Sequence, residues 1–133
     1  MKTHRNHHPV LIGAVLIALL VVPTAGISAQ SPPRVGIAPL ENKSDDANSD
    51  TLAAEISQTI NVNLDLLGGY EVQQLSSAIR DTSPAELDSF AVRNRYDNVI
   101  FGSISQPDAQ TTEFRVAMFD RADGAIVYDN TWQ

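Results

Sequence analysis

Residues 34–50, RVGIAPLENKSDDANSD, decide the fold of this chain. The run from Val35 to Leu40 is too short for a helix and is apolar at both alternating sets of positions, which is typical of a strand covered on both faces of a sheet. Pro39 has no N–H group to donate, so we expect the hydrogen-bond ladder to weaken there and residues 41–50 to form a loop. The stretch therefore predicts a buried central strand that leaves the sheet through a polar loop.

The apolar spacing changes after this loop. Side chains now recur at steps of three or four residues, the period of a helix with one buried stripe, at Leu52, Ala53, Ile56, Ile60, Leu64 and Leu67. Ser49 or Asp50 is expected to cap the helix start, and Gly68-Gly69 to end it because glycine adopts positive φ freely. Burial of each large aliphatic side chain contributes about 1.5–3 kcal/mol, whereas ordering each backbone residue costs about 1–2 kcal/mol. Such a helix is expected to be stable only when it docks on a sheet.

The next two elements repeat the order of strand and helix. Residues 70–75 alternate in polarity and predict a short edge strand. Residues 83–95 predict a second helix, because Ser83 can cap it, Pro84 suits the first helical position and Glu86 completes a capping box. Its apolar stripe consists of Leu87, Phe90 and Ala91.

The last third of the chain predicts strands only. Residues 98–105 are apolar at both sets of positions, residues 111–120 alternate with one face toward solvent, and residues 125–132 return after a turn that ends at Gly124. Right-handed crossovers then predict an α/β fold of three layers, α/β/α, with elements in the order β-α-β-α-β-β-β. The predicted mixed sheet has five strands in the spatial order 2-1-3-4-5, so its first and third strands are neighbours.

Residues 1–29 have the pattern of a secretory signal peptide. Lys2 and Arg5 precede an uninterrupted apolar run at residues 10–22, and Ala29 ends an acceptable cleavage site. A retained anchor is the alternative, although the run falls short of the roughly 20 residues that cross a bilayer. We therefore expect a flexible leader at residues 30–33 and one domain at residues 34–133, in the periplasm or another extracytoplasmic compartment, with no stable membrane insertion after cleavage.

Composition restricts the partners and the chemistry. Residues 30–133 contain all 16 acids but seven of the nine bases, so anionic nucleic acids and lipid surfaces are unfavourable partners. The sequence has no cysteine, which excludes disulfides and the lipid-attachment residue of bacterial lipoproteins. All three histidines, His4, His7 and His8, precede the expected cleavage site.

No residue is assigned to catalysis, to a cofactor or to a metal. Lys43-Ser44 lies too far from the helix start and lacks the glycines of a phosphate loop. Asp46, Asn48 and Asp50 match the start of a calcium loop, but Thr51 and Ser57 occupy the glycine and glutamate positions, so we interpret the stretch as a solvated loop.

Two groups of side chains have a structural interpretation that is simpler than ligand binding. Tyr128 and Trp132 are expected to share one face of the last strand with Ile126 and to cover the core rather than to form a ligand platform. The second group is interpreted as a solvated face rather than a basic site and consists of Arg93, Arg95 and Arg115.

Three segments together carry a family resemblance: the opening VGIAPLENKS, the helix and strand LAAEISQTINVNLDLLGGYEV, and RYDNVIFGSI followed by FRVAMFDRADGAIVYD. They resemble the N-terminal domain of TolB and its relatives in the CsgG, FlgO and LpoB group of bacterial envelope proteins. The resemblance implies an anticodon-binding-like fold with strand 4 antiparallel, and docking to other envelope proteins without catalysis. The β-propeller of TolB has no counterpart before Gln133, so binding roles of the propeller do not carry over.

The sequence thus predicts a non-enzymatic protein–protein interaction module of the cell envelope. Contact would be made by the edge strands at 70–75 and 125–132, which could also pair copies into a homo-oligomer, or by the loop at 41–50. One alternative is a small-ligand or metal-binding domain, or a hydrolase that uses carboxylates near the ends of the first and third strands. Another is that the chain is a truncated piece of a longer TolB-like protein.

Overall fold

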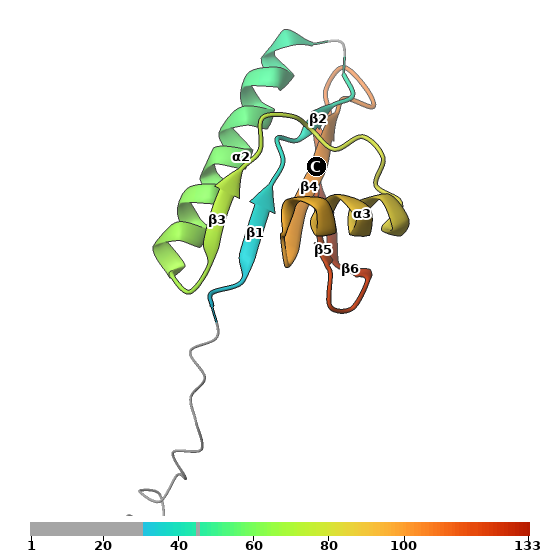
Figure 1. Cartoon of the computed structure of the whole chain (residues 1–133). Coiled ribbons are helices and arrows are strands. Elements are labelled where there is room, and N and C mark those ends of the chain that lie inside the picture. The colour runs from blue at the N-terminus through green and yellow to red at the C-terminus, as the bar shows by residue number, and fades with distance from the viewer. Residues whose placement is uncertain (1–30, 45) are drawn as a thin grey trace, which may run out of the picture. The chain divides into compact units, whose positions relative to one another are not determined.

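The computed structural model describes residues 31–44 and 46–133 (Figure 1). The predicted signal peptide at residues 1–29 lies outside the described residues. The elements are β1 (Arg34–Ile37), β2 (Glu41–Asn42), α2 (Ala47–Leu67), β3 (Glu71–Gln74), α3 (Pro84–Asn94), β4 (Asn98–Ser105), β5 (Glu113–Asp120) and β6 (Ala125–Trp132). Neither helix of this described part is long and apolar enough to cross a membrane.

The sheet has the predicted spatial order, β3-β1-β4-β5-β6. Strands β3, β1 and β4 are parallel, and β5 is antiparallel to both of its neighbours, as expected for the fourth predicted strand. The prediction missed one element, because β2 pairs with β4 inside the expected loop. Pairing stops at Pro39, which has no N–H to donate, and resumes at Glu41, so the loop is shorter than predicted.

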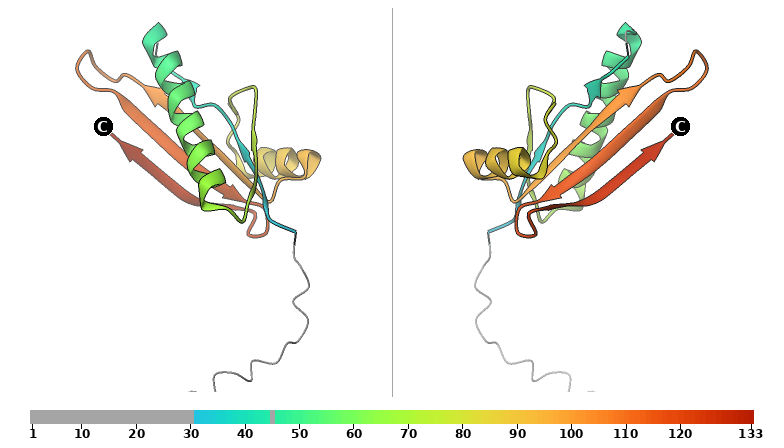
Figure 2. Two further views of the ribbon diagram at one scale, coloured as in Figure 1. Left: turned by 90° about the vertical axis from the view of Figure 1, so that its left-hand side faces the viewer. Right: turned by 90° about the vertical axis from the view of Figure 1, so that its right-hand side faces the viewer.

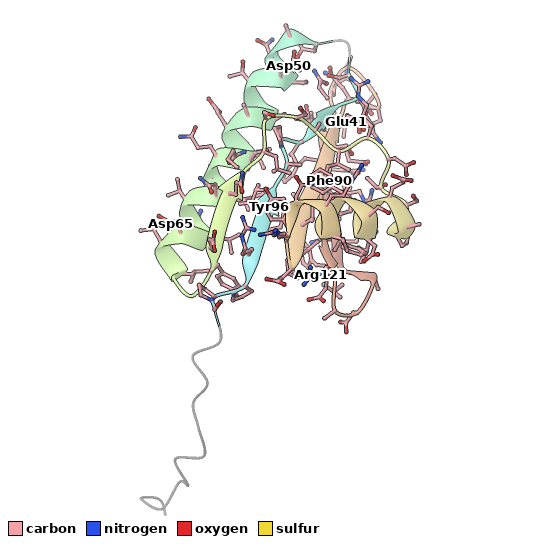
Figure 3. The ribbon with its side chains drawn as sticks, viewed as in Figure 1. Glu41, Asp50, Asp65, Phe90, Tyr96 and Arg121 are labelled. Carbon is pink, nitrogen blue, oxygen red and sulfur yellow. The ribbon has the colours of Figure 1, made fainter. Side chains whose placement is uncertain are left out.

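The two central strands are buried on both faces, as the sequence predicts. Val35, Ile37 and Ile100 face α2, whereas Val99 and Phe101 face α3 with Leu87. The helices therefore cover opposite faces of the sheet and form the three expected layers (Figure 2). On the α3 face, Tyr96 stacks on Phe90 with ring centroids 6.2 Å apart (Figure 3).

Close packing in the sheet depends on Gly102 of β4. A Cβ atom at this position would overlap the carbonyl oxygen of Arg115 on β5 and would lie 2.8 Å from Cδ2 of Leu40. Real Cβ atoms do not approach other atoms so closely, so only glycine lets β4 pack against β5 and Leu40 here.

Helix α2 begins four residues earlier than predicted. Its N-cap is Asp46, whose carboxylate accepts a hydrogen bond from the Asn48 N–H at 3.2 Å, whereas Ser49 and Asp50 lie inside the first turn. The carboxylate satisfies an N–H group that has no partner within the helix, so the first turn extends into the predicted loop. The end agrees with the prediction, since Gly68 has a φ of 69°.

The buried stripe of α2 contains a serine that the apolar pattern could not indicate. Ser57 is only 1% exposed. Its Oγ donates to the Ala53 carbonyl at 2.8 Å and accepts from the Leu40 N–H at 3.1 Å. Leu40 lies between the paired residues of β1 and β2, so this hydroxyl accepts a buried N–H for which the strand pairing supplies no acceptor. Leu52 and Leu67, which were predicted in the stripe, are exposed instead.

Helix α3 has the predicted bounds but not the predicted capping box. Ser83 occupies the N-cap position without a side-chain hydrogen bond, and its own N–H donates to Asp81 at 3.0 Å. Leu87 and Ala91 are fully buried and Phe90 packs against them, which confirms the predicted stripe.

A β-bulge in the last hairpin corrects the predicted faces of β6. Phe119 pairs with Ile126 and Met118 pairs with Tyr128, so Val127 is the extra residue. Ile126 therefore packs on the α3 face, whereas Tyr128 lies on the α2 face. The predicted solvent-exposed face of β5 is also shorter than expected, because Ala117 and Phe119 are buried on the α3 side.

Candidate functional site

Helix α2 covers only part of its face of the sheet. It packs mainly over β3, β1, β2 and β4. The positions of β5 and β6 on this face form a second area, which we call the open half-face, at Phe114, Val116, Met118, Tyr128, Asn130 and Trp132. In the left view of Figure 2, α2 runs obliquely across the sheet and passes in front of part of β5, whereas most of β6 has no helix of the described residues over it. This part of the sheet therefore presents side chains to the outside.

The open half-face is aromatic and partly exposed. Tyr128 and Trp132 are 45% and 37% exposed. The Trp132 ring stacks on Phe114, with centroids 5.2 Å apart and planes 19° apart. Stacking orders the indole against Phe114, and part of the Trp132 side chain stays exposed to another molecule. The predicted role of Tyr128 and Trp132 as core cover is thus fulfilled on one side only.

A cavity of about 270 Å³ opens where the open half-face meets the end of α2. Its walls are mostly apolar and include Leu64, Tyr70 and Met118. Its polar end contains Asp120, whose carboxylate accepts from Asn98 at 2.9 Å and from the N–H groups of the following turn. The hydrogen bonds from the Asp123 N–H and from Asn98 lower the pKa of Asp120, so the cavity ends in a carboxylate at neutral pH.

Charge is distributed unevenly between the two faces. None of the seven bases within the described part of the chain lies on α2 or at a strand position that faces α2. Helix α2 itself carries three acids, of which Asp50 and Asp65 are labelled in Figure 3, and its last turn has no basic residue. The α2 side of the molecule is therefore apolar and acidic.

Comparison with known proteins bears on the fold. No family model matches the chain, and no curated protein matches it. The LpoB C-terminal domain from Escherichia coli has a TM-score of 0.53 at 12% identity, covering 88% of this chain and 90% of that one. Lipoprotein GNA1162 from Neisseria meningitidis has a TM-score of 0.54 at 13% identity, covering 76% and 78%.

The domain has an LpoB-like fold. A second LpoB C-terminal domain, from Salmonella enterica, agrees, with a TM-score of 0.55 at 10% identity over 77% of this chain and 82% of that one. The family resemblance inferred from the sequence is confirmed at the level of the fold. At these identities the likeness carries no residue roles, so the site depends on the geometry of this chain.

The acids of the calcium-like stretch serve the start of α2 in this LpoB-like domain. Asp46 is the N-cap, Asn48 donates to it, and Asp50 accepts from the Asn42 side chain at 2.9 Å. Over residues 31–44 and 46–133, no three His, Cys, Asp or Glu side chains gather as metal ligands would.

The carboxylates after the first and third predicted strands are held by local partners. Glu41 lies 3.7 Å from the Lys43 ammonium group, and Asp108 accepts from the N–H groups of Gln110 and Thr111. The Gln110 N–H, followed by Thr111, lowers the pKa of Asp108. A general acid needs the opposite shift, so this carboxyl group is not prepared for acid catalysis.

The basic residues also have local partners. Arg115 on β5 makes two hydrogen bonds to the Asp129 carboxylate on β6, at 2.7 and 2.6 Å. Arg93 lies on α3 and donates to the Ser89 carbonyl at 3.3 Å, and Arg95 is the C-cap of that helix. Arg115 is thus paired with an acid of the neighbouring strand, and the interpretation of the three arginines as a solvated face stays a prediction.

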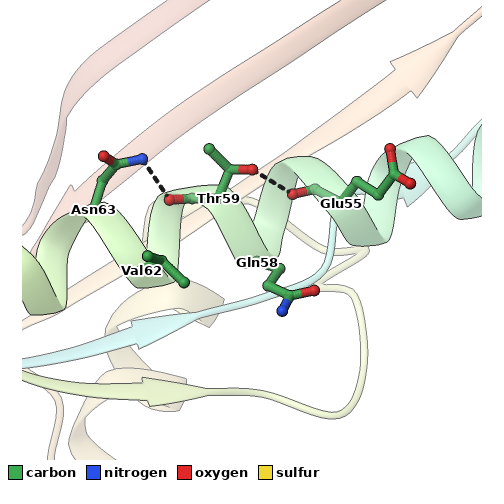
Figure 4. A pocket seen from close by; sticks show the side chains of 5 residues that line it. All are labelled: Glu55, Gln58, Thr59, Val62 and Asn63. Carbon is green, nitrogen blue, oxygen red and sulfur yellow. Dashed lines mark hydrogen bonds between the residues drawn. The ribbon is translucent and has the colours of Figure 1, made fainter.

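A shallow depression of about 400 Å³ lies on the outer side of α2 (Figure 4). Its lining comes from this one helix, and its polar groups bond to the helix itself. Thr59 donates to the Glu55 carbonyl at 2.8 Å, and Asn63 donates to the Thr59 carbonyl at 2.7 Å. No polar groups from different elements converge here, so the open half-face is the stronger candidate site.

Proposed function

We propose that this chain is a non-enzymatic protein–protein interaction module of the bacterial cell envelope, exported by a signal peptide at residues 1–29. The observation that carries the proposal is the open half-face, where Tyr128 and Trp132 stay exposed on a sheet face that α2 covers only in part. Exposed aromatic clusters concentrate in protein-binding sites, because they bury much area at little entropic cost.

The likeness to the LpoB C-terminal domains and to a neisserial lipoprotein supports an envelope role. The cavity beside Asp120 is smaller than the roughly 300–1,000 Å³ of most small-molecule sites, which favours a macromolecular partner over a free ligand. The face also suits docking better than the edges do. Strand β3 has four residues, and the bulge at Val127 bends β6, so neither edge is a long flat template for an added strand.

Site-specific photo-crosslinking in cells tests the proposal. A photoreactive amino acid would replace Tyr128 on the open half-face, Val92 on α3 or Gln73 on β3, each in the full 133-residue chain. We expect the processed protein in the extracytoplasmic fraction and a discrete protein adduct from at least one position. Retention in the cytoplasm, or an absence of adducts from all three positions, would contradict the proposed function.

A further inference from the structure

We infer that the open half-face binds one amphipathic α-helix of a partner protein, and that this helix carries Lys or Arg beside its apolar stripe. The inference rests on the proposed function and deepens it by naming the binding face and the chemistry of the partner. Three independent features of the molecule support it: the dimensions of the face, the unburied part of the α2 stripe, and the distribution of charge.

The dimensions of the open half-face fit one helix. Two strands at the usual spacing of about 4.8 Å give a width of about 10 Å, close to the 10–12 Å diameter of an α-helix with its side chains. Strands β5 and β6 each have eight residues. At about 3.3 Å per residue they extend for about 26 Å, the length of a helix of about 17 residues. A second helix can therefore lie beside α2 on the same face.

The apolar stripe of α2 continues beyond the surface that the sheet covers. Leu52 and Leu67 are 39% and 76% exposed. Leu52 precedes Ile56 by four residues and Leu67 follows Ile60 by seven, so each lies on the side of α2 that carries these isoleucines. Ile56 packs against the same buried cluster as Phe114 of β5. A helix placed over β5 and β6 would cover this remaining side of the stripe.

The charges around the open half-face select a basic partner. The cavity beside the open half-face is lined by Asp120, and α2 adds Asp50, Glu55 and Asp65 without any base. The C-terminus of α2 lies at the same end and contributes negative dipole charge that no basic side chain offsets. A cationic helix antiparallel to α2 would bring its positive N-terminal end to this position.

The same charges argue against other occupants. A second copy that docked through the same face would bring the same acids against Asp120 and α2, and like charges at an interface oppose association. Nucleic acids and anionic lipids are repelled for the same reason. A basic helix gains from both the apolar and the electrostatic features of the face.

Binding of a defined peptide tests the inference. The probe is an 18-residue amphipathic helical peptide of leucine and lysine, and its control is the same pattern with glutamate in place of lysine. Trp132 is the sole tryptophan of the chain and lies on the face, so its fluorescence reports binding directly. With the full chain as expressed and purified, we expect a saturable blue shift with the lysine peptide and none with the glutamate peptide. Hydrogen exchange should slow in β5, β6 and α2.

Two variants with the same change of charge locate the contact. Tyr128→Arg places a cation on the face and should weaken binding of the lysine peptide at least tenfold. Val92→Arg, at a position of α3 that is 55% exposed, should change it less than twofold. If Tyr128→Arg does not fold, Tyr128→Ala provides the comparison, with an expected loss of at least threefold.

Four results would overturn the inference: no binding of the lysine peptide, equal weakening by both arginine variants, equal binding of the glutamate peptide, or exchange protection confined to α3. Such failure is separable from failure of the proposed function. Crosslinks from Val92 or Gln73 without peptide binding would reject the helix and keep the interaction module.

Discussion

Replacement of Ser57 by alanine tests how the fold satisfies the buried Leu40 N–H between β1 and β2. The Ser57 hydroxyl accepts from the Leu40 N–H at 3.1 Å, and both residues are buried. Loss of this acceptor leaves a buried N–H without a partner, which costs about 1–3 kcal/mol. Alanine returns a few tenths of a kcal/mol, about 0.5 at most, through its higher helix propensity. We therefore expect Ser57→Ala to lower the free energy of unfolding by about 0.5–2.5 kcal/mol.

Thr59→Ala is the matched control on the same helix. Thr59 also donates to the carbonyl four residues earlier, at 2.8 Å, but it is exposed and no buried N–H depends on it (Figure 4). Its removal should change stability by less than about 0.5 kcal/mol.

Urea and thermal unfolding of the two variants measure the difference. For a domain of this size about 1 kcal/mol corresponds to about 4–8 °C in Tm, so Ser57→Ala should unfold at least about 2 °C below the parent protein. A loss of stability in Ser57→Ala that is no larger than the change in Thr59→Ala would refute the role assigned to the Leu40–Ser57 hydrogen bond.

Three further predictions concern packing, pH and helix capping. Gly102→Ala should lower the free energy of unfolding by at least about 3 kcal/mol or prevent folding, because its Cβ would overlap the Arg115 carbonyl; urea unfolding or the yield of folded protein measures this. The hydrogen bonds from Arg115 lower the pKa of Asp129. The ionised Asp129 therefore stabilises the fold at pH values above its usual pKa of 3.8, and this stabilisation is lost as pH falls through the lower pKa of the folded state. Asp129→Asn should make the fall in the free energy of unfolding below pH 3.8 less steep. Asp46→Ala should lower the unfolding free energy by about 1 kcal/mol, whereas Ser83→Ala should have almost no effect in the same assay, because only Asp46 makes a side-chain cap bond; equal losses would contradict this.

Sequence reasoning predicted the elements better than their ends. Both apolar strands, the helix ending at Gly68 and the hairpin turn at Gly124 follow from local spacing and turn chemistry, and the structure has all of them. Helix α2 starts at Ala47 because the Asp46 carboxylate caps it, although Ser49 and Asp50 are equally good capping residues by type. The choice depends on where Asn42 and Asp50 meet across the loop, at 2.9 Å, which a sequence does not display.

The candidate site was only partly visible in the sequence. Tyr128 and Trp132 were recognised as a pair on one face, but Ile126 was placed with them because strict alternation ignores the bulge at Val127. The exposure of Leu52 and Leu67 could not be predicted either, because the same stripe would be buried if the sheet were covered along its whole width.

The sequence by itself determined the α/β class, the order of the strands and the burial of Ile37 and Ile100, because alternation and right-handed crossovers are local or topological constraints. Only the tertiary structure decided which apolar side chains stay at the surface. Coverage depends on the width of the sheet relative to one helix, and α2 spans β3, β1 and β4 but not β6. The open half-face is therefore a consequence of how one helix packs on a wider sheet. The order of residues along the chain does not show which strands that helix covers.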